Sequence, residues 1–345
     1  MSKKKPTLKD IAEIAEVSVA TVSWAINGTK ARIPQKTRAK IIKIAKEIGY
    51  RPNVLARNLV QGKTDLIGFV TDDVATSPFA GEIIAGAQEE AWKSNKILLI
   101  VNTDGKKEVE DNALKMMKEQ QVQGIIYSTW YHRKVTSPSL FAEIPSLFVN
   151  CYSQQEDYMA VVPNEVQGGR TATDLLIKAG HKRIAFINTT SVSPAQSDRL
   201  QGYKDALKNA NLTYDDALVI YAKPNQEGGY DVANSIIGLG VSAVFCHNDR
   251  VAMGLYDGLR KRNVKIPADI SIVGFDNQEI IAEHLHPKLT TVALPHYNLG
   301  AIGVQQLLQK IEEHQIFDKK KLIKVNCPLI TRNSIRKLRK EEKPL

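Results

Sequence analysis

Short polar side chains surround Trp24 in the stretch VSVATVSWAIN, residues 17–27. They are Ser18, Thr21, Ser23 and Asn27. Hydroxyl and amide groups at helical spacing can donate hydrogen bonds to the phosphate oxygens of DNA. In the simpler interpretation, the stretch is an amphipathic helix whose Val19, Val22 and Ile26 face a core while the hydroxyls face water. The flanking residues decide between these two interpretations.

The basic charge of the chain is concentrated at its N-terminal end. Residues 1–63 contain 14 Lys and Arg against four Asp and Glu, whereas the remaining residues contain 33 of each kind. Such a segment attracts polyanions, because every phosphate that it neutralises releases counterions. A solvated charged surface is the alternative. Since the basic residues alternate with helical patterns, we expect this segment to bind nucleic acid.

Apolar spacing predicts the helices that would position these side chains. The predicted spans are residues 8–15, 19–26 and 35–48. Thr7 and Asp10 form a capping box at the first start, and Ser18 caps the second helix. Pro34 opens the third helix and Gly49 ends it. Two helices joined by a tight turn on a basic face are typical of the helix-turn-helix, whose second helix enters the major groove.

Three segments carry a specific resemblance to a known family: TLKDIAEIAEVSVATVSWAING, IGYRPNVLARNL and DLIGFV. They resemble the N-terminal region of the lactose-repressor (LacI/GalR) family of bacterial transcription regulators, and the similarity continues through nearly the whole chain. It implies a DNA-binding headpiece at 1–50, a hinge helix and linker at 51–63, and a two-lobed effector-binding and dimerisation core at 64–332. A charged tail would follow at 333–345.

The same resemblance implies which headpiece residues contact DNA. The positions that match phosphate-contacting and positioning residues are Thr7, Ser18, Thr21, Ser23, Asn27, Tyr50 and Asn53. Val19 and Ala20 lie where the family varies its base contacts, and their small apolar side chains would meet thymine methyl groups. Trp24 departs from the family, which usually has Arg there. Because Trp cannot make the bidentate contact of Arg to guanine, we predict either an unusual operator or a Trp ring packed against sugar and methyl groups.

The stretch RPNVLARNLVQG, residues 51–62, resembles the family's hinge helix. A helix of only about eight residues is too short to be stable alone in water, so we expect it to form on DNA and against its dimer mate. Leu59 matches the wedge residue that enters the minor groove, and Arg57 is placed to follow the phosphates. A buried packing leucine is the alternative for Leu59.

From Thr64 onward, short apolar runs alternate with helical patterns. A first series runs from LIGFV to SLFVNC, and a second runs from MAVVP to LTTVAL. This alternation is typical of parallel sheets covered by helices on both faces. We therefore predict an α/β chain with an all-α helix-turn-helix headpiece and a periplasmic-binding-protein-like core of two Rossmann-like lobes. Ligands of such sheets bind beyond the carboxyl ends of the strands.

Polar and aromatic residues that follow the apolar runs are the candidates for effector binding. They are Asp72, Asp73, Ser77, Phe79, Asn150, Arg199, Tyr230, Asn248 and Asp276. Carboxylates, amides and a fork-shaped Arg match the vicinal hydroxyls of a sugar, and Phe79, Tyr230 or Trp130 could cover its apolar face. The resemblance supports Arg199, Asn248 and Asp276 best. Asp249 is expected to be a helix cap only.

Two features of the effector site stay open. Asn164 and Glu165 depart from the usual Asp-Asn pair of the family, and no role follows for them from the sequence. A small sugar is the predicted effector. A purine or nucleoside corepressor and a phosphorylated carrier protein are the alternatives.

Other classes of protein are disfavoured by missing motifs. The chain contains no GxxxxGK[ST], GxSxG, HExxH or CxxC, so we expect neither an enzyme nor a cofactor or metal. Cys151, Cys246 and Cys327 are too scattered for a disulfide framework and suit a reducing cytosol. No stretch approaches 18 apolar residues, and no apolar segment follows the basic start. These features favour a cytoplasmic protein without membrane contact over a sugar-binding transport protein.

Oligomeric state follows from the expected mechanism. One recognition helix reads too little sequence alone, so we expect a homodimer on a pseudo-palindromic operator. The segment LPHYNLGAIGVQQLLQKI, after Ala293, has an apolar helical stripe that would serve either the dimer surface or the core. Sugar binding between the lobes is expected to release the DNA by a population shift, with corepression as the alternative.

Overall fold

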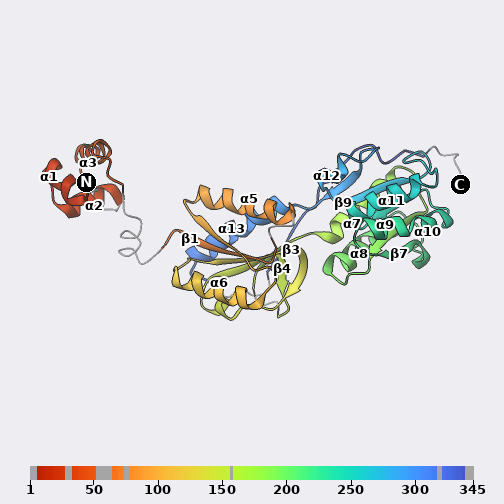
Figure 1. Ribbon diagram of the computed structural model, residues 1–345, viewed down its shortest axis with the longest axis horizontal. Coiled ribbons are helices and arrows are strands. Elements are labelled where there is room, and N and C mark those ends of the chain that lie inside the picture. Colours follow the sequence, from red (N-terminus) through yellow and green to blue (C-terminus); the bar gives the residue numbers. More distant parts are fainter. Residues whose placement is uncertain are drawn as a thin grey trace. The chain divides into compact units, whose positions relative to one another are not determined.

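The computed structural model describes residues 6–27, 33–51, 64–73, 78–155, 158–316 and 321–338, without the side chains of residues 27 and 78–80 (Figure 1). The chain divides into two compact units, residues 1–64 and 65–345. Each unit is built on its own hydrophobic core.

The first unit contains the three predicted helices. They are α1 (Leu8–Ala15), α2 (Val19–Asn27) and α3 (Gln35–Glu47), which confirms the three predicted spans to within one residue. The predicted capping box is also present: the Thr7 backbone N–H donates to Asp10 Oδ2 at 2.6 Å, and Asp10 N–H donates to Thr7 Oγ1. Glu16 makes the turn between α1 and α2 in the left-handed region, at φ 57°. Thr21 N–H then donates to Ser18 Oγ at 3.1 Å, as expected for a helix cap.

A small apolar core holds these helices together. Ile11, Val22 and Ile41, one from each helix, are fully buried. Lys40 adds a polar link, since its Nζ donates to the Ala15 carbonyl at the end of α1 at 3.0 Å. In α2, the buried side chains among the described residues are those of Val22 and Ala25, so most of this helix faces outward.

A six-stranded sheet forms the first lobe of the second unit. Its strands are β1 (Leu66–Thr71), β2 (Ile97–Asn102), β3 (Ile125–Val135), β4 (Ser146–Ser153), β5 (Ala160–Pro163) and β11 (Leu322–Val325), in the order β11-β5-β4-β3-β1-β2. All neighbouring strands are parallel. Helices α5 (Pro78–Lys93) and α13 (His296–Glu312) cover one face, and α6 (Lys107–Glu119) covers the other (Figure 1).

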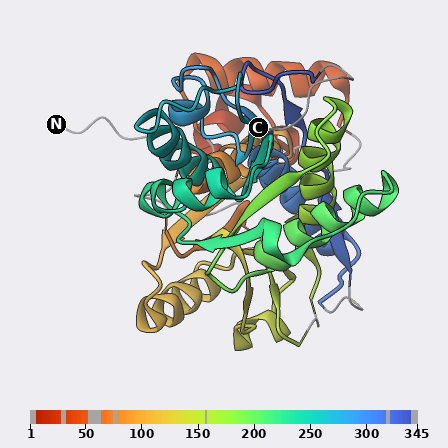
Figure 2. The same cartoon turned by 90° about the vertical axis from the view of Figure 1, so that its right-hand side faces the viewer.

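The second lobe repeats this architecture. Its strands are β6 (Ile184–Thr189), β7 (Val219–Ala222), β8 (Ala243–Cys246), β9 (Ser271–Asp276), β10 (Thr290–Ala293) and β12 (Leu329–Ile330), in the order β12-β10-β9-β8-β6-β7. Helices α7 (Glu165–Lys178) and α8 (Pro194–Asn209) lie on one face. Helices α9 (Gln226–Asp231), α10 (Ala233–Gly238) and α11 (Asp249–Arg260) lie on the other (Figure 2). Only β12 is antiparallel among the paired strands of the described residues.

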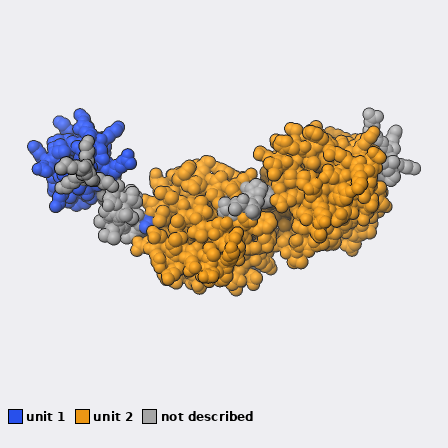
Figure 3. Space-filling view, viewed as in Figure 1, with its two compact units in different colours: residues 1–64 blue, residues 65–345 orange. Residues whose placement is uncertain are grey.

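The sequence predicted that one lobe ends before MAVVP and that the other begins there, and this assignment of strands to lobes is wrong. The run MAVVP, placed in the second series, forms β5 and pairs with β4 in the first sheet. Strand β11 returns to the first sheet much later in the sequence, beside β5. Both lobes lie within the second unit (Figure 3), and the chain crosses between them more than once. Apolar periodicity identifies a strand but not the sheet that it joins.

Helix α13 settles the two interpretations of the segment after Ala293. Leu299, Val304 and Leu307 are fully buried against the first sheet and α5, so the stripe packs in the core. Residues 333–338, assigned to a charged tail from the sequence, contact the second lobe: Ser334 is buried and its Oγ donates to the Ile272 carbonyl at 2.6 Å.

Two further findings concern the described residues as a whole. Their helices are all too short or too polar to cross a membrane. Cys151, Cys246 and Cys327 are free and buried.

Candidate functional site

A cavity of about 390 Å³ lies between the two lobes. The first lobe lines it with residues 130–132 of β3, Asn150 in the second half of β4 and His296 at the start of α13. The second lobe contributes Arg199 and Asp276, among others. The cavity thus lies toward the carboxyl-terminal halves of strands from both sheets, on the side where α/β folds bind their ligands.

Arg199 is the centre of a buried ionic network in this cavity. Its side chain is only 4% exposed, and its Nε donates to Glu165 Oε2 at 2.7 Å. Its Nη1 donates to the His247 carbonyl, and its Nη2 lies 3.6 Å from Asp276 Oδ1. Arg199 Cζ lies 3.6 Å from the centre of the Phe275 ring, a cation–π contact. The guanidinium therefore has acceptors along its edge and an aromatic ring against its face.

Two glycines allow Glu165 and Arg199 to meet. Glu165 begins α7 and Arg199 lies in α8, so the two helices must approach closely. A Cβ added at Gly169 would lie 2.4 Å from the Arg199 carbonyl oxygen, and one added at Gly202 would lie 2.2 Å from a backbone oxygen of α7. Larger side chains would separate the helices and pull the carboxylate away from the guanidinium.

Burial and charge shift the two carboxyl groups in opposite directions. Burial alone would raise the pKa of Glu165, but the Arg199 charge and the nearby His132 outweigh it and hold that pKa at about 2. Burial raises the pKa of Asp276 to about 7, because Arg199 is farther away and Glu165 adds repulsion. Near neutral pH, Glu165 is thus ionised, while Asp276 is close to its midpoint.

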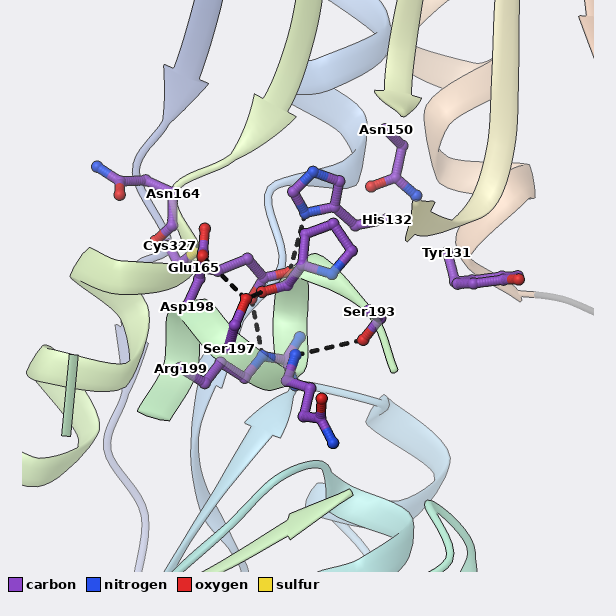
Figure 4. Close-up of polar contacts among 12 residues, drawn as sticks. Tyr131, His132, Asn150, Asn164, Glu165, Ser193, Ser197, Asp198, Arg199 and Cys327 are labelled. Carbon is purple, nitrogen blue, oxygen red and sulfur yellow. Dashed lines mark hydrogen bonds and ion pairs between the residues drawn. The ribbon is translucent and has the colours of Figure 1, made fainter. Parts of the chain in front are cut away.

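Three histidines surround this network. His132 Nδ1 lies 3.7 Å from Glu165 Oε1, and neither of its ring nitrogens has a hydrogen-bond partner among the described residues. Figure 4 shows the His132 ring pointing from the first lobe toward Glu165. Burial and the Arg199 charge lower the pKa of His247 well below its usual value. Burial lowers the pKa of His296 to about 3, so both of these rings are neutral.

Four of the predicted effector residues line the cavity: Asn150, Arg199, Asn248 and Asp276. Asn150 adopts a left-handed backbone, at φ 59°, and its Nδ2 donates to the Thr129 carbonyl at 2.9 Å. Asn248 caps α11, because its Oδ1 accepts from the Val251 N–H at 2.9 Å. The structure brings the four residues together from four different segments of the chain.

Asp249 is not the helix cap that the sequence suggested. The cap is Asn248, and Asp249 is fully buried in the first turn of α11. Its Oδ2 accepts from the Gln278 N–H at 2.7 Å, and its Oδ1 accepts from Thr291 Oγ1 at 2.6 Å. Asp249 therefore fixes the segment after β9 that carries Gln278 to the cavity.

Asp72 lies behind the cavity wall. Its Oδ1 accepts from the Trp130 N–H at 2.9 Å, and its Oδ2 lies 2.8 Å from Arg133 Nη2. It supports the irregular part of β3, where pairing with β4 shifts between Ser128 and Arg133. Asp73 is likewise not among the described lining residues. Ser77 and the side chain of Phe79 lie outside the described residues.

Tyr230 lies away from the cavity, contrary to the prediction. Gly229 lets α9 pack closely on α11, since a Cβ there would lie 2.0 Å from the Val251 carbonyl oxygen. That packing directs Tyr230 toward the other end of α11, where its hydroxyl accepts from Lys261 Nζ at 2.9 Å. Its ring also lies beside Arg262.

Several lining residues were missed at the level of sequence. They are Tyr131, His132, Glu165, Thr189, Ser191, Val192, Ser193, Ala195, Pro224, His247, Arg250, Gln278, Leu294 and His296. Trp130, predicted only as an aromatic cover for the sugar, lines the cavity as well. Glu165 had one usable signal, its departure from the family's usual pair. His132 had none, because the predicted strand ended before the irregular part of β3.

The outward face of α2 carries the predicted DNA-contacting residues. Ser18, Val19 and Ala20 are exposed at its start, and Trp24 is 47% exposed one turn later. Thr21 and Ser23 are partly exposed beside them, as is Tyr50 after α3, while Thr7 is exposed before α1. Asn53, Arg57 and Leu59, the side chain of Asn27 and the whole predicted hinge helix lie outside the described residues.

A helix-turn-helix unit followed by a two-lobed α/β core defines a DNA-binding regulator with a periplasmic-binding-protein-like domain. Comparison with known proteins agrees. Residues 7–53 match the family model of bacterial regulatory proteins, lacI family, and residues 64–333 match that of periplasmic binding proteins and the sugar binding domain of the LacI family. The chain belongs to the LacI family of bacterial transcription regulators.

Similar proteins are named as repressors. The chain is 32% identical to the ribose operon repressor of Haemophilus influenzae, covering 89% of this chain and 92% of that protein. It is 31% identical to the transcriptional repressor PurR of Vibrio atlanticus, covering 96% and 99%. Among solved structures, it resembles the transcriptional regulator CelR in complex with cellobiose, with a TM-score of 0.66, 26% identity and coverage of 96% and 100%.

Proposed function

We propose that this regulator is a repressor that holds operator DNA as a homodimer and is released when a small neutral sugar fills the cavity between its lobes. The proposal includes no catalytic step and places the protein in the cytoplasm with the DNA. The proposed effector-binding residues of the protein are Asn150, Arg199, Asn248 and Asp276, together with Glu165. The single observation that carries the sugar assignment is the ionic network around Arg199.

The network suits hydroxyl groups better than it suits an anion. The buried Arg199 is already paired with Glu165, so the most buried cation of the cavity is neutralised before a ligand arrives. Carboxylate, amide and guanidinium groups side by side offer the paired donors and acceptors that vicinal hydroxyls need. One similar protein is named as the ribose operon repressor, and another is a transcriptional regulator solved in complex with cellobiose.

The DNA-binding part of the proposal rests on the exposed face of α2. The hydroxyls of Ser18, Thr21 and Ser23 would position the DNA backbone, while Val19, Ala20 and Trp24 would reach base edges. At each half-site, the remaining predicted DNA-contacting residues would bind phosphates, and Leu59 would enter the minor groove as a wedge. The remaining residues are Thr7, Asn27, Tyr50, Asn53 and Arg57.

Coupling between the two sites follows from where the cavity lies. Its lining comes from both lobes, so a ligand that fills it favours one relative orientation of the lobes. We propose that the favoured orientation disfavours DNA binding by the dimer. The opposite sign, in which the ligand strengthens DNA binding, is the alternative outcome.

The test has two stages on the full chain. A thermal-shift screen against sugars, purines and nucleosides should find stabilisation by at least one sugar, and fluorescence anisotropy should then show that this sugar weakens binding to an operator selected from a random duplex pool. Arg250→Ala, at the cavity, should weaken sugar binding, whereas Tyr230→Ala, outside it, should not.

Three results would contradict parts of the proposal. Stabilisation by purines alone would overturn the sugar assignment. Tighter operator binding with sugar would replace release by corepression. Equal affinity for the selected operator and a scrambled duplex at every salt concentration would remove the repressor function itself.

A further inference from the structure

A second cavity, of about 210 Å³, lies between the same two lobes. Strands β4, β5 and β11 of the first lobe form one wall, and the first turns of α8 in the second lobe form the other. Apart from His132, its polar and aromatic lining side chains take no part in the network around Arg199. Among them are Tyr152, Tyr158, Asp198, Lys321 and Lys324.

His132 is the residue that lines both cavities. Its side chain is only 5% exposed, and neither ring nitrogen has a hydrogen-bond partner among the described residues. On one side the ring faces Glu165, as Figure 4 shows, and on the other side it lies edge-on to the Tyr152 ring, with 5.6 Å between ring centroids. Nδ1 already faces the Glu165 carboxylate at 3.7 Å, so Nε2 is the ring nitrogen without a polar neighbour in the described part of the chain. Leaving a buried ring nitrogen unbonded is costly, so Nε2 points to a ligand group that supplies its hydrogen bond.

The charges of the second cavity indicate what that ligand carries. Asp198 offers carboxylate acceptors, and Lys321 and Lys324 offer ammonium donors across the same small volume. Hydroxyl groups can accept from the lysines and donate to the carboxylate, so a sugar can satisfy both kinds of charged group at once. Tyr152, Tyr158, Pro194 and Leu322 supply the apolar surface that covers the C–H face of a sugar ring.

We propose that the second cavity is a subsite for a second sugar ring, so that the effector is a disaccharide whose two rings lie on either side of His132. One ring lies beside Arg199, the other lies beside Asp198 and Lys324, and His132 Nε2 bonds to a hydroxyl group near the glycosidic link. This inference rests on the proposed sugar effector and narrows it from sugars in general to two-ring sugars.

The test compares each monosaccharide with its own disaccharides by isothermal titration calorimetry on the full chain. The probes are glucose against cellobiose and maltose, galactose against lactose and melibiose, and xylose against xylobiose. We expect one disaccharide to bind at least about tenfold more tightly than either of its component sugars, since a second ring adds hydrogen bonds to charged groups.

Substitutions in the second cavity separate the contributions of the two sugar rings to binding. Asp198→Ala and Lys324→Ala should each weaken the disaccharide about tenfold and leave the dissociation constant of the monosaccharide unchanged, because neither side chain lines the larger cavity. Lys324→Gln keeps most of the side chain and should also weaken the disaccharide. Lys115→Ala removes an exposed lysine of α6 and serves as the matched control.

The possible results separate the second sugar subsite from the sugar effector on which it rests. A monosaccharide that binds as tightly as every disaccharide, or a disaccharide that Asp198→Ala and Lys324→Ala leave unaffected, overturns the second subsite and keeps the sugar effector. Failure of every sugar to bind overturns both.

Discussion

The headpiece and the core treat charge in opposite ways. Residues 1–63 carry the entire net charge of +10, and the buried side chains among the described headpiece residues are apolar. The remaining residues are electrically balanced, but they bury Glu165, Arg199 and Asp276 beside one another. Charge therefore has two roles in this chain. The exposed charges of the headpiece attract a polyanion, and the buried charged side chains of the core hold one another in place in the wall of the cavity.

The two uses of charge respond to different conditions. Exposed charges on the headpiece are screened by salt, so DNA binding should weaken steeply as ionic strength rises. The buried network is shielded from salt, and it responds instead to protonation and to the loss of a partner. Changes in the core and in the headpiece should therefore have separable effects.

Removing the carboxylate of Glu165 should have the largest effect. Glu165→Leu leaves the Arg199 guanidinium buried without its 2.7 Å partner, and breaking a buried pair in this way costs about 3 to 5 kcal/mol. We expect the free energy of unfolding of the core, measured by urea denaturation, to fall by that amount. Amide exchange in α1, α2 and α3 should not change, because those helices have their own core.

A surface pair provides the control for this prediction. Glu227 lies 3.0 Å from Lys223 with both side chains about two-thirds exposed, so Glu227→Leu should leave the free energy of unfolding unchanged within error. If Glu165→Leu destabilises the core no more than Glu227→Leu does, the buried pair is not what organises the pocket.

Protonation of Asp276 should have the next largest effect. Its folded pKa of about 7 lies above the usual value of about 3.9 for an unfolded Asp, so the folded chain binds this proton more readily. The group therefore favours folding increasingly as the pH falls from about 7 toward 4, and this contribution is lost as the pH rises through 7. Relative to Asp276→Asn, the wild type should gain about 2 to 3 kcal/mol between pH 8 and pH 5.

Urea denaturation of both proteins at several pH values measures this difference. Other groups also titrate in the core, but they are present in both chains and cancel in the comparison. A constant difference between pH 8 and pH 5 would show that Asp276 is ionised throughout and that Arg199 compensates for its burial.

Local patterns predicted the headpiece well. The Thr7–Asp10 capping box, the Ser18 cap and the spans of α1 and α3 depend on residues within a few positions of one another, and all are present in the structure. The alternation of strands and helices likewise predicted the class of the core. Such features are governed by short-range hydrogen bonding and periodicity, which a single sequence displays directly.

The parts that could not be predicted depend on contacts between distant residues. Glu165 meets Arg199 across 34 positions of sequence because two glycines bring their helices together, and nothing local signals that approach. MAVVP has the pattern of a strand but no mark of which sheet it joins. Tyr230 has the right residue type for sugar stacking, and only the packing of α9 on α11 turns it away.

Trp24→Arg should have the smallest effect, and one confined to the headpiece. Trp24 is 47% exposed on α2, so the substitution should leave the core unchanged while restoring the side chain that pairs with guanine O6 and N7. We expect selection from a random duplex pool to show a new preference for guanine at one position in each half-site, worth about 1 to 3 kcal/mol in anisotropy titrations.

Ile14→Arg is the matched control, because it adds the same charge at a 52% exposed apolar position of α1 and should raise the affinity for all duplexes alike. If both variants select the operator of the wild type, position 24 contributes charge alone, and the exposed face of α2 reads its bases through Val19 and Ala20.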